Sequence, residues 1–231
     1  MQLTFASYNI RKAIGRDGDR NPARILDVID ELGADIVALQ EVDIRFGARE
    51  GVIERIALSH RGWQVASVPM KPQSLGWHGN ALLVREGIGI EEVAGDHLPR
   101  LEPRGAVRAL LHVGGQDICV TGVHLDLSGL MRQRQLAHIC GASRAPDVPA
   151  VMLGDFNTWR AVFPRGRGLA AHWNMVEPGE SFPAHRPFLS LDRLVHTPHW
   201  NVDSAHVHAS PLAQLASDHL PIRVELTLTN N

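Results

Sequence analysis

Short apolar runs that end in glycine or polar residues recur along the chain and predict many buried strands. The clearest run is Val151-Met152-Leu153, which leads directly into Gly154-Asp155-Phe156-Asn157. Gly154 indicates a tight turn, and strand-like alternation directs Asp155 and Asn157 to one side while the aromatic ring between them points into the core. On its own, this Gly-Asp-x-Asn pattern is equally typical of an Asx-type turn without chemistry.

The same pattern predicts the other elements. Besides the strand that begins at Val151, we expect strands at residues 3–10, 35–41, 63–68, 80–84, 88–93, 106–113, 118–124, 189–195, 202–208 and 220–228. We expect helices between Asn21 and Gly33, at 50–59, at 130–143 and, as a short element, near 169–173. Strands outnumber helices, and hairpins mix with helical crossovers. We therefore expect an α/β (α+β) protein with mixed sheets covered by helices, in a single domain over residues 1–231.

Composition narrows the possible classes of protein. The formal net charge of -2 provides no overall basic field for gripping nucleic acid, which counts against a non-specific DNA binder. Two cysteines are too few for a disulfide framework. The chain starts with a strand pattern rather than an apolar leader, and no apolar run approaches the roughly 18 residues of a membrane span. We expect a cytoplasmic protein without a transmembrane segment.

Four further predicted strands carry polar residues at or beside their ends. They are found at Ser7-Tyr8-Asn9, Leu39-Gln40-Glu41, Val123-His124-Leu125-Asp126 and Ser217-Asp218-His219. Carboxylates and carboxamides side by side suit a hard metal ion, or a water molecule that must be oriented and deprotonated. Two weaker candidates for substrate contact are Asn80, at a strand start, and Arg104, in a loop; an ordinary turn and a solvated arginine are the alternatives.

In this order, the polar strand ends resemble those of the endonuclease/exonuclease/phosphatase (DNase I-like) superfamily. The matching segments are SYNIRKA, IVALQEVD, GNALLV, VTGVHLD, VMLGDFNTW, LSLDRLV and ASDHLPIRVEL. Each motif is weak alone, but LQE, HLD, GDFN and SDH in this order are specific together. The resemblance implies a four-layer α-β-β-α sandwich, in which two mixed β-sheets lie face to face with helices outside. It also implies a site at one mouth of the sandwich, built from loops of both sheets.

The resemblance further implies a Mg²⁺-dependent hydrolase of phosphoester bonds, with Mn²⁺ able to substitute. Glu41 is the best candidate ligand, because Mg²⁺ keeps several waters and takes only one or two carboxylates. Asn9 would assist the metal or a phosphate oxygen, and Asp218 would support the metal site or its neighbours.

The remaining motif residues take catalytic roles by the same resemblance. Asp155 would orient or deprotonate the attacking water, and Asn157 would hold that water or the phosphate. His219 would act as an acid/base or as a charged stabiliser, with its ring held by Asp192. His124 would donate to a phosphate oxygen.

Several substrates fit this chemistry. A phosphodiesterase, either nuclease-like or acting on phospholipid or sphingomyelin head groups, is favoured over a phosphomonoesterase of a small metabolite or inositol phosphate. The abasic-site endonuclease branch carries a tyrosine where this chain has residues 123–126, and the only tyrosine here is Tyr8. A catalytically inactive binding protein on the same fold is disfavoured, because each metal and acid/base position of the family pattern carries a residue of the required type. No obligate protein partner is inferred.

Overall fold

The computed structural model describes residues 1–99, 104–142, 148–159 and 172–229, whose strands form two six-stranded sheets. The first sheet has the strand order β11 (Trp200–Val207), β12 (Ile222–Leu228), β1 (Gln2–Asn9), β2 (Ile36–Gln40), β4 (Asn80–Arg85) and β3 (Trp63–Ala66). The second has the order β5 (Gly89–His97), β6 (Gly105–Val113), β7 (Gln116–His124), β8 (Ala150–Asp155), β10 (Asp192–His196) and β9 (Asn174–Val176).

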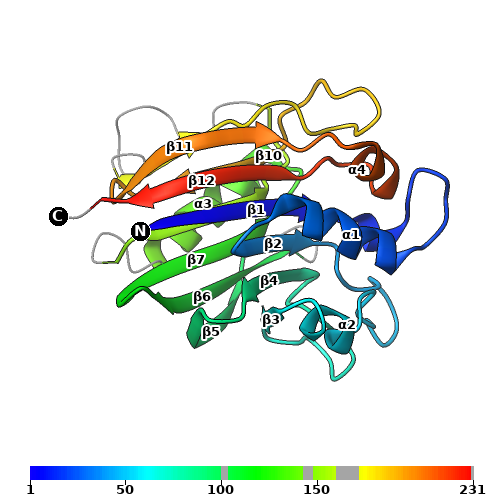
Figure 1. The fold of residues 1–231 in the computed structure, drawn as a ribbon, viewed down its shortest axis with the longest axis horizontal. Coiled ribbons are helices and arrows are strands. Elements are labelled where there is room, and N and C mark those ends of the chain that lie inside the picture. The colour runs from blue at the N-terminus through cyan, green and yellow to red at the C-terminus, as the bar shows by residue number, and fades with distance from the viewer. Residues whose placement is uncertain (100–103, 143–147, 160–171, 230–231) are drawn as a thin grey trace.

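Helices cover the outer face of each sheet. They are α1 (Pro22–Leu32), α2 (Arg55–Ser59), α3 (Gly129–Ala142) and α4 (Pro211–Ala216), with a 3-10 turn η1 (Arg11–Ala13) after β1. Figure 1 shows α1 beside α4 at the sheet that contains β1, whereas α3 belongs to the other sheet. No helix of the described residues is long and apolar enough to cross a membrane.

Three hydrophobic clusters fill the spaces between these layers. In the middle cluster, residues such as Phe5 and Leu82 of the first sheet meet Leu153 of the second. An outer cluster packs α1 on the first sheet, with Ile29 as one contact, and another packs α3 on the second through Ile139. Three cores between four layers confirm the predicted α-β-β-α sandwich.

Both sheets are mixed, as predicted. β1 and β2 are parallel and are joined through α1, and β7 and β8 are parallel and are joined through α3. The other strand pairs are antiparallel. Because the carboxyl ends of parallel neighbours meet at one edge, each crossover brings two strand ends together. This geometry positions the site.

Local sequence signals explain most element boundaries. Asn21 caps α1, since its side chain accepts a hydrogen bond from the Arg24 backbone N–H at 3.0 Å. The hairpin of β6 and β7 turns at Gly114 and Gly115, whose φ angles of 59° and 79° are those of a tight hairpin turn. Both the helix and the hairpin were predicted.

The helix expected over 50–59 is wrong in its first half, because α2 begins only at Arg55. Gly51 instead forms a β-bridge with Asp43, and its N–H donates to the Gln73 carbonyl at 2.8 Å. This long-range pairing overrides the local helical pattern. The short strand β9 and helix α4 were not predicted, although Ser210 caps α4 and its first residue is a proline. Most of the helix expected near 169–173 lies outside the described residues.

Gly154 allows β8 to approach β7 at the point where the site begins. Its φ is 152°, and a Cβ atom there would lie 1.9 Å from the carbonyl oxygen of Val123. Because that oxygen belongs to the backbone of a central strand, it cannot move without breaking the sheet. The close approach places Asp155 directly beside His124 in the parallel register.

We therefore expect Gly154→Ala to lower the free energy of unfolding by about 3–5 kcal/mol, measured by urea denaturation. Gly141→Ala, in α3, is the matched control, because a Cβ there has nothing within 4 Å. A helical alanine in place of glycine should raise stability by up to about 1 kcal/mol. Equal stability of the two variants would contradict the close contact at Gly154.

Candidate active site

The predicted site residues come together at one end of both sheets. In the first sheet, Asn9 of β1 pairs in register with Gln40 of β2, which pairs with Asn80 of β4. In the second sheet, Asp155 of β8 lies between His124 of β7 and Asp192 of β10. The loop before β12 adds residues 218 and 219 at this end, because β12 runs antiparallel to β1.

The carboxylate of Asp155 is the centre of this arrangement and is only 1% exposed. Its Oδ2 atom lies 3.1 Å from Asn9 Nδ2, 3.4 Å from His124 Nε2 and 3.8 Å from His219 Nε2. Its Oδ1 atom accepts the backbone N–H of Asn157 at 2.9 Å. One oxygen therefore fixes the carboxylate on its own loop, and the other faces groups from both sheets.

The pair of Asp192 and His219 predicted from the family pattern is present. His219 Nδ1 lies 2.8 Å from Asp192 Oδ2, which also accepts the hydroxyl of Ser181 at 2.5 Å. The ring of Phe182 packs against His219 with 4.8 Å between ring centroids. These contacts hold the imidazole with Nε2 directed toward Asp155.

His219 carries a proton at neutral pH. Burial alone lowers the pKa of His219, but the negative charges of Asp192 and Asp155 outweigh burial and raise that pKa to about 10. Both ring nitrogens of this imidazolium are donors. It therefore presents a positive N–H at Nε2 beside Asp155.

His124 has the opposite protonation state. Burial, with the positive charge of Arg104 nearby, lowers the pKa of His124 to about 3, against the attraction of Asp155. Arg104 Nη1 lies 2.7 Å from His124 Nδ1 and is also close to Nε2. Nε2 also faces the carboxylate of Asp155, which can only accept, so the neutral ring is assigned its proton on Nε2 and accepts from Arg104 at Nδ1.

Glu41 lies on the other side of the site, where its carboxylate contacts the ammonium group of Lys12. The backbone N–H of Lys12 also donates to the Glu41 carbonyl at 3.2 Å, which ties the loops after β1 and β2 together. Both residues have left-handed backbones, with φ of 59° at Glu41 and 56° at Lys12. Such strained non-glycine residues occur preferentially at functional sites.

The donor groups at this end suit a hard metal ion that keeps its waters. No group of three or more His, Cys, Asp or Glu within the described ranges is arranged to hold a metal by itself. Mg²⁺ needs only one or two carboxylates besides water. The carboxylate of Glu41 and the carboxamide oxygen of Asn9 are donors of the required type.

Three other predicted residues have defined partners. Asp218 Oδ2 pairs with Arg11 Nε at 3.4 Å, and the Arg11 backbone N–H donates to Asn9 Oδ1 at 3.1 Å. Asn157 Nδ2 donates to the Leu125 carbonyl at 2.9 Å. Asn80 is fully buried, and its Nδ2 donates to the Gly105 carbonyl of the other sheet at 3.0 Å. The roles assigned to these residues stay predictions.

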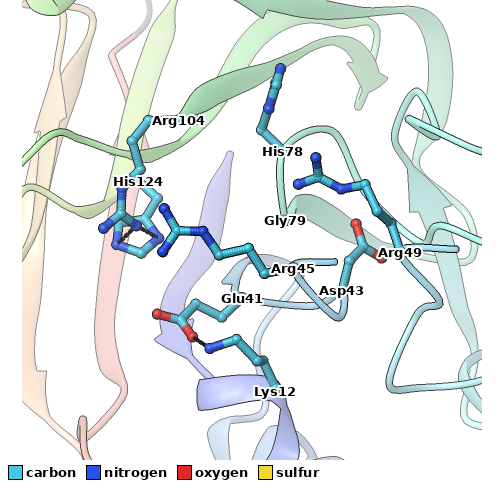
Figure 2. A pocket seen from close by; sticks show the side chains of 9 residues that line it. All are labelled: Lys12, Glu41, Asp43, Arg45, Arg49, His78, Gly79, Arg104 and His124. Carbon is cyan, nitrogen blue, oxygen red and sulfur yellow. Dashed lines mark hydrogen bonds and ion pairs between the residues drawn. The ribbon is translucent and has the colours of Figure 1, made fainter. Parts of the chain in front are cut away.

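A pocket beside these residues contains side chains that sequence reasoning missed. Figure 2 shows its lining, which comprises Lys12, Glu41, Asp43, Arg45, Arg49, His78, Gly79, Arg104 and His124. Only Glu41, Arg104 and His124 of this set were predicted. Lys12 could have been found, because it lies three residues after Asn9, within the matching segment SYNIRKA. Arg45 and Arg49 could not, because they lie between the expected strand at 35–41 and the expected helix at 50–59, where no local pattern places a side chain in a pocket.

Comparison with known proteins agrees with the fold. A model of the Endonuclease/Exonuclease/phosphatase family matches residues 6–219. Among curated proteins, none matches the sequence significantly. The solved structure of an endonuclease/exonuclease/phosphatase from Beutenbergia cavernae DSM 12333 is similar at 22% identity, covering 99% of this chain and 72% of that one, with a TM-score of 0.73.

Two further solved structures share this fold. The human Nocturnin catalytic domain with bound sulfate anion is 20% identical, covering 99% of this chain and 95% of that one, with a TM-score of 0.72. D. rerio TDP2 complexed with single strand DNA product is 17% identical, covering 98% of this chain and 99% of that one, with a TM-score of 0.75.

The two histidines should be distinguishable by NMR titration. We expect the ring resonances of His219 to stay in the protonated form across neutral pH and to titrate near 10, and those of His124 to stay neutral down to about 3. The proton on His219 stabilises the fold fully below pH 6.5, and this contribution is lost as the pH rises through about 10.

Asp192→Asn removes the main charge that holds this proton, so the pKa of His219 should fall. The resonances are assigned from their absence in His219→Ala and His124→Ala. A His219 signal that titrates near neutral pH in the wild type would contradict the ion pair with Asp192.

Proposed function

The chain belongs to the endonuclease/exonuclease/phosphatase family, and we propose that, among these phosphoester hydrolases, it is a Mg²⁺-dependent phosphodiesterase. The observation that supports this proposal is the convergence of Asn9, His124 and His219 on Asp155 Oδ2. One buried carboxylate thus faces a carboxamide, a neutral imidazole and an imidazolium. Attack of water on a phosphoester requires a base, donors for the phosphoryl oxygens and help for the leaving oxygen.

Glu41 would hold the metal ion, with the carboxamide oxygen of Asn9 beside it. When bound there, Mg²⁺ would supply charge neutralisation at the phosphate and a lowered pKa for a coordinated water. Lys12 is the cationic partner of Glu41 in this structure, so its ammonium group would have to move aside or bind the phosphate. Asp218 would act through Arg11, whose backbone N–H fixes the Asn9 side chain.

The opposite protonation of the two histidines assigns the other roles. An imidazolium cannot accept a proton, so His219 would stabilise the charge that develops on the phosphoryl group and donate from Nε2 to an oxygen. Asp155 would then orient and deprotonate the attacking water. His124 would donate from Nε2 to a phosphate oxygen, while Asn157 keeps Asp155 in place. Asp192 fixes the ring of His219.

The proposal also covers the cellular environment of the protein, its class of substrate and the extent of its catalytic domain. Cys119 and Cys140 are both buried and not disulfide-bonded, which is consistent with a reducing, cytoplasmic environment. The substrate would be a phosphoester of a nucleic acid, a phospholipid head group or a small metabolite. We further propose that residues 1–231 act as one catalytic domain.

The test is hydrolysis of bis-p-nitrophenyl phosphate and p-nitrophenyl phosphate with Mg²⁺, with Mn²⁺ or with EDTA. We expect metal-dependent turnover of the diester, and a loss of about 10²–10⁴-fold in His219→Ala, because a positioned proton donor contributes that much. His206→Ala is the matched control, since His206 is exposed on β11.

The outcomes separate the candidate functions. Turnover of the monoester alone would replace the phosphodiesterase by a phosphomonoesterase at the same site. Turnover that continues in EDTA would contradict the role of the metal. An equal loss in both histidine variants would show that the effect does not come from the site.

A further inference from the structure

The pocket beside the hydrolytic residues is strongly cationic. Its lining carries the positive charges of Lys12, Arg45, Arg49 and Arg104 against the carboxylates of Glu41 and Asp43. This excess contrasts with the formal net charge of -2 for the whole chain. Like charges gathered in one cavity repel each other, and an anionic ligand relieves that repulsion.

Two of these cations come from a loop that the fold holds in place. Asp43, at the start of the loop, accepts the backbone N–H groups of Leu75 at 2.6 Å and Gly76 at 3.2 Å. At the end of the loop, the Arg49 carbonyl accepts the hydroxyl of Ser74 at 2.8 Å. Because both ends are tied to the neighbouring loop, the arginines are presented without a large ordering cost on binding.

Arg49 shows two further signs of a binding role. Its backbone has a left-handed φ of 55°, a conformation that is costly for a residue with a side chain. Its Nε atom is buried and has no hydrogen-bond partner in the part of the chain that the structure describes. A buried donor without a partner is unfavourable, and a rotation of the side chain toward a phosphate oxygen in the pocket would satisfy it.

The pocket extends between two groups of basic side chains. Figure 2 shows His124 and Arg104 on one side of it and Arg49 with His78 on the other. A substrate whose reacting phosphate lies near His124 would therefore extend toward Arg49.

We infer that Arg49 forms a second anion subsite across the pocket from His124, that Arg45 reaches between these two ends, and that the substrate carries another phosphate group beside the one that is hydrolysed. This inference rests on the proposed function, since it describes the substrate of that same site. Arginine suits the role because its planar guanidinium donates two parallel hydrogen bonds to phosphate oxygens. A phosphorylated nucleotide and a phosphorylated polyol both have this chemistry.

The test is calorimetric binding of orthophosphate and tripolyphosphate in EDTA, so that no metal bridges the ligand to the protein. We expect the wild type to bind tripolyphosphate at least about tenfold more tightly than orthophosphate, because several charge-assisted hydrogen bonds form only with the longer anion. The double variant Arg45→Ala/Arg49→Gln should lose this preference. Arg134→Ala is the matched control, because Arg134 is exposed on α3.

Equal affinity for the two anions in the wild type would overturn the inference, as would a preference that survives in the double variant. Melting curves of both variants show whether each is folded. Titration with adenosine 3′,5′-bisphosphate and with an inositol trisphosphate then separates the two sources of the second phosphate. Arginine-dependent binding of either one supports the subsite.

Hydrolysis of bis-p-nitrophenyl phosphate separates this inference from the proposed function. An enzyme that hydrolyses the diester but binds tripolyphosphate no better than orthophosphate lacks the subsite and keeps the function. A protein that binds tripolyphosphate through the two arginines but hydrolyses no ester has the anion pocket without the proposed phosphodiesterase activity, and the subsite would then not be a substrate site.

Discussion

The hydrogen bond from Asn9 to Asp155 joins the two sheets at the end where the site lies. A buried carboxylate is tolerated only when donors surround it, and here the donors come from β1, β7 and the loop before β12. The packing of the two sheets therefore brings these groups together and excludes bulk water from them. The site depends on this packing more than on any one loop, since residues from widely separated parts of the chain meet at one oxygen atom.

The two histidines show how neighbouring charges and burial determine the protonation state of a side chain. His219 faces carboxylates and holds a proton, whereas His124 is buried next to Arg104 and remains neutral. Environments that push two pKa values apart distinguish the groups that can donate a proton from those that can accept one. In this protein His219 already holds a proton and His124 has too low a pKa to take one at neutral pH, so Asp155 is the available base.

Local sequence patterns were sufficient for the strand ends and for mixed sheets covered by helices, whereas the four layers were implied by the family resemblance. Apolar runs located most strands, and Asn21 with Pro22 marked α1. The family resemblance joined Asp192 to His219, although nothing in the local sequence links them. The cationic loop was missed for a physical reason. Asp43 and Gly51 pair with each other and with residues 73–76, and these long-range bonds, which no local pattern predicts, hold the loop that carries Arg45 and Arg49.

The most direct test of the account is the metal-dependent rate of diester hydrolysis by Asp155→Asn. The amide has the size of the carboxylate, so the variant should remain folded, but an amide cannot accept a proton from water. We expect a rate at least about 10²-fold below that of the wild type at saturating Mg²⁺, the lower end of what a positioned general base contributes. A folded variant with wild-type turnover would contradict the assignment of Asp155 as the centre of the active site.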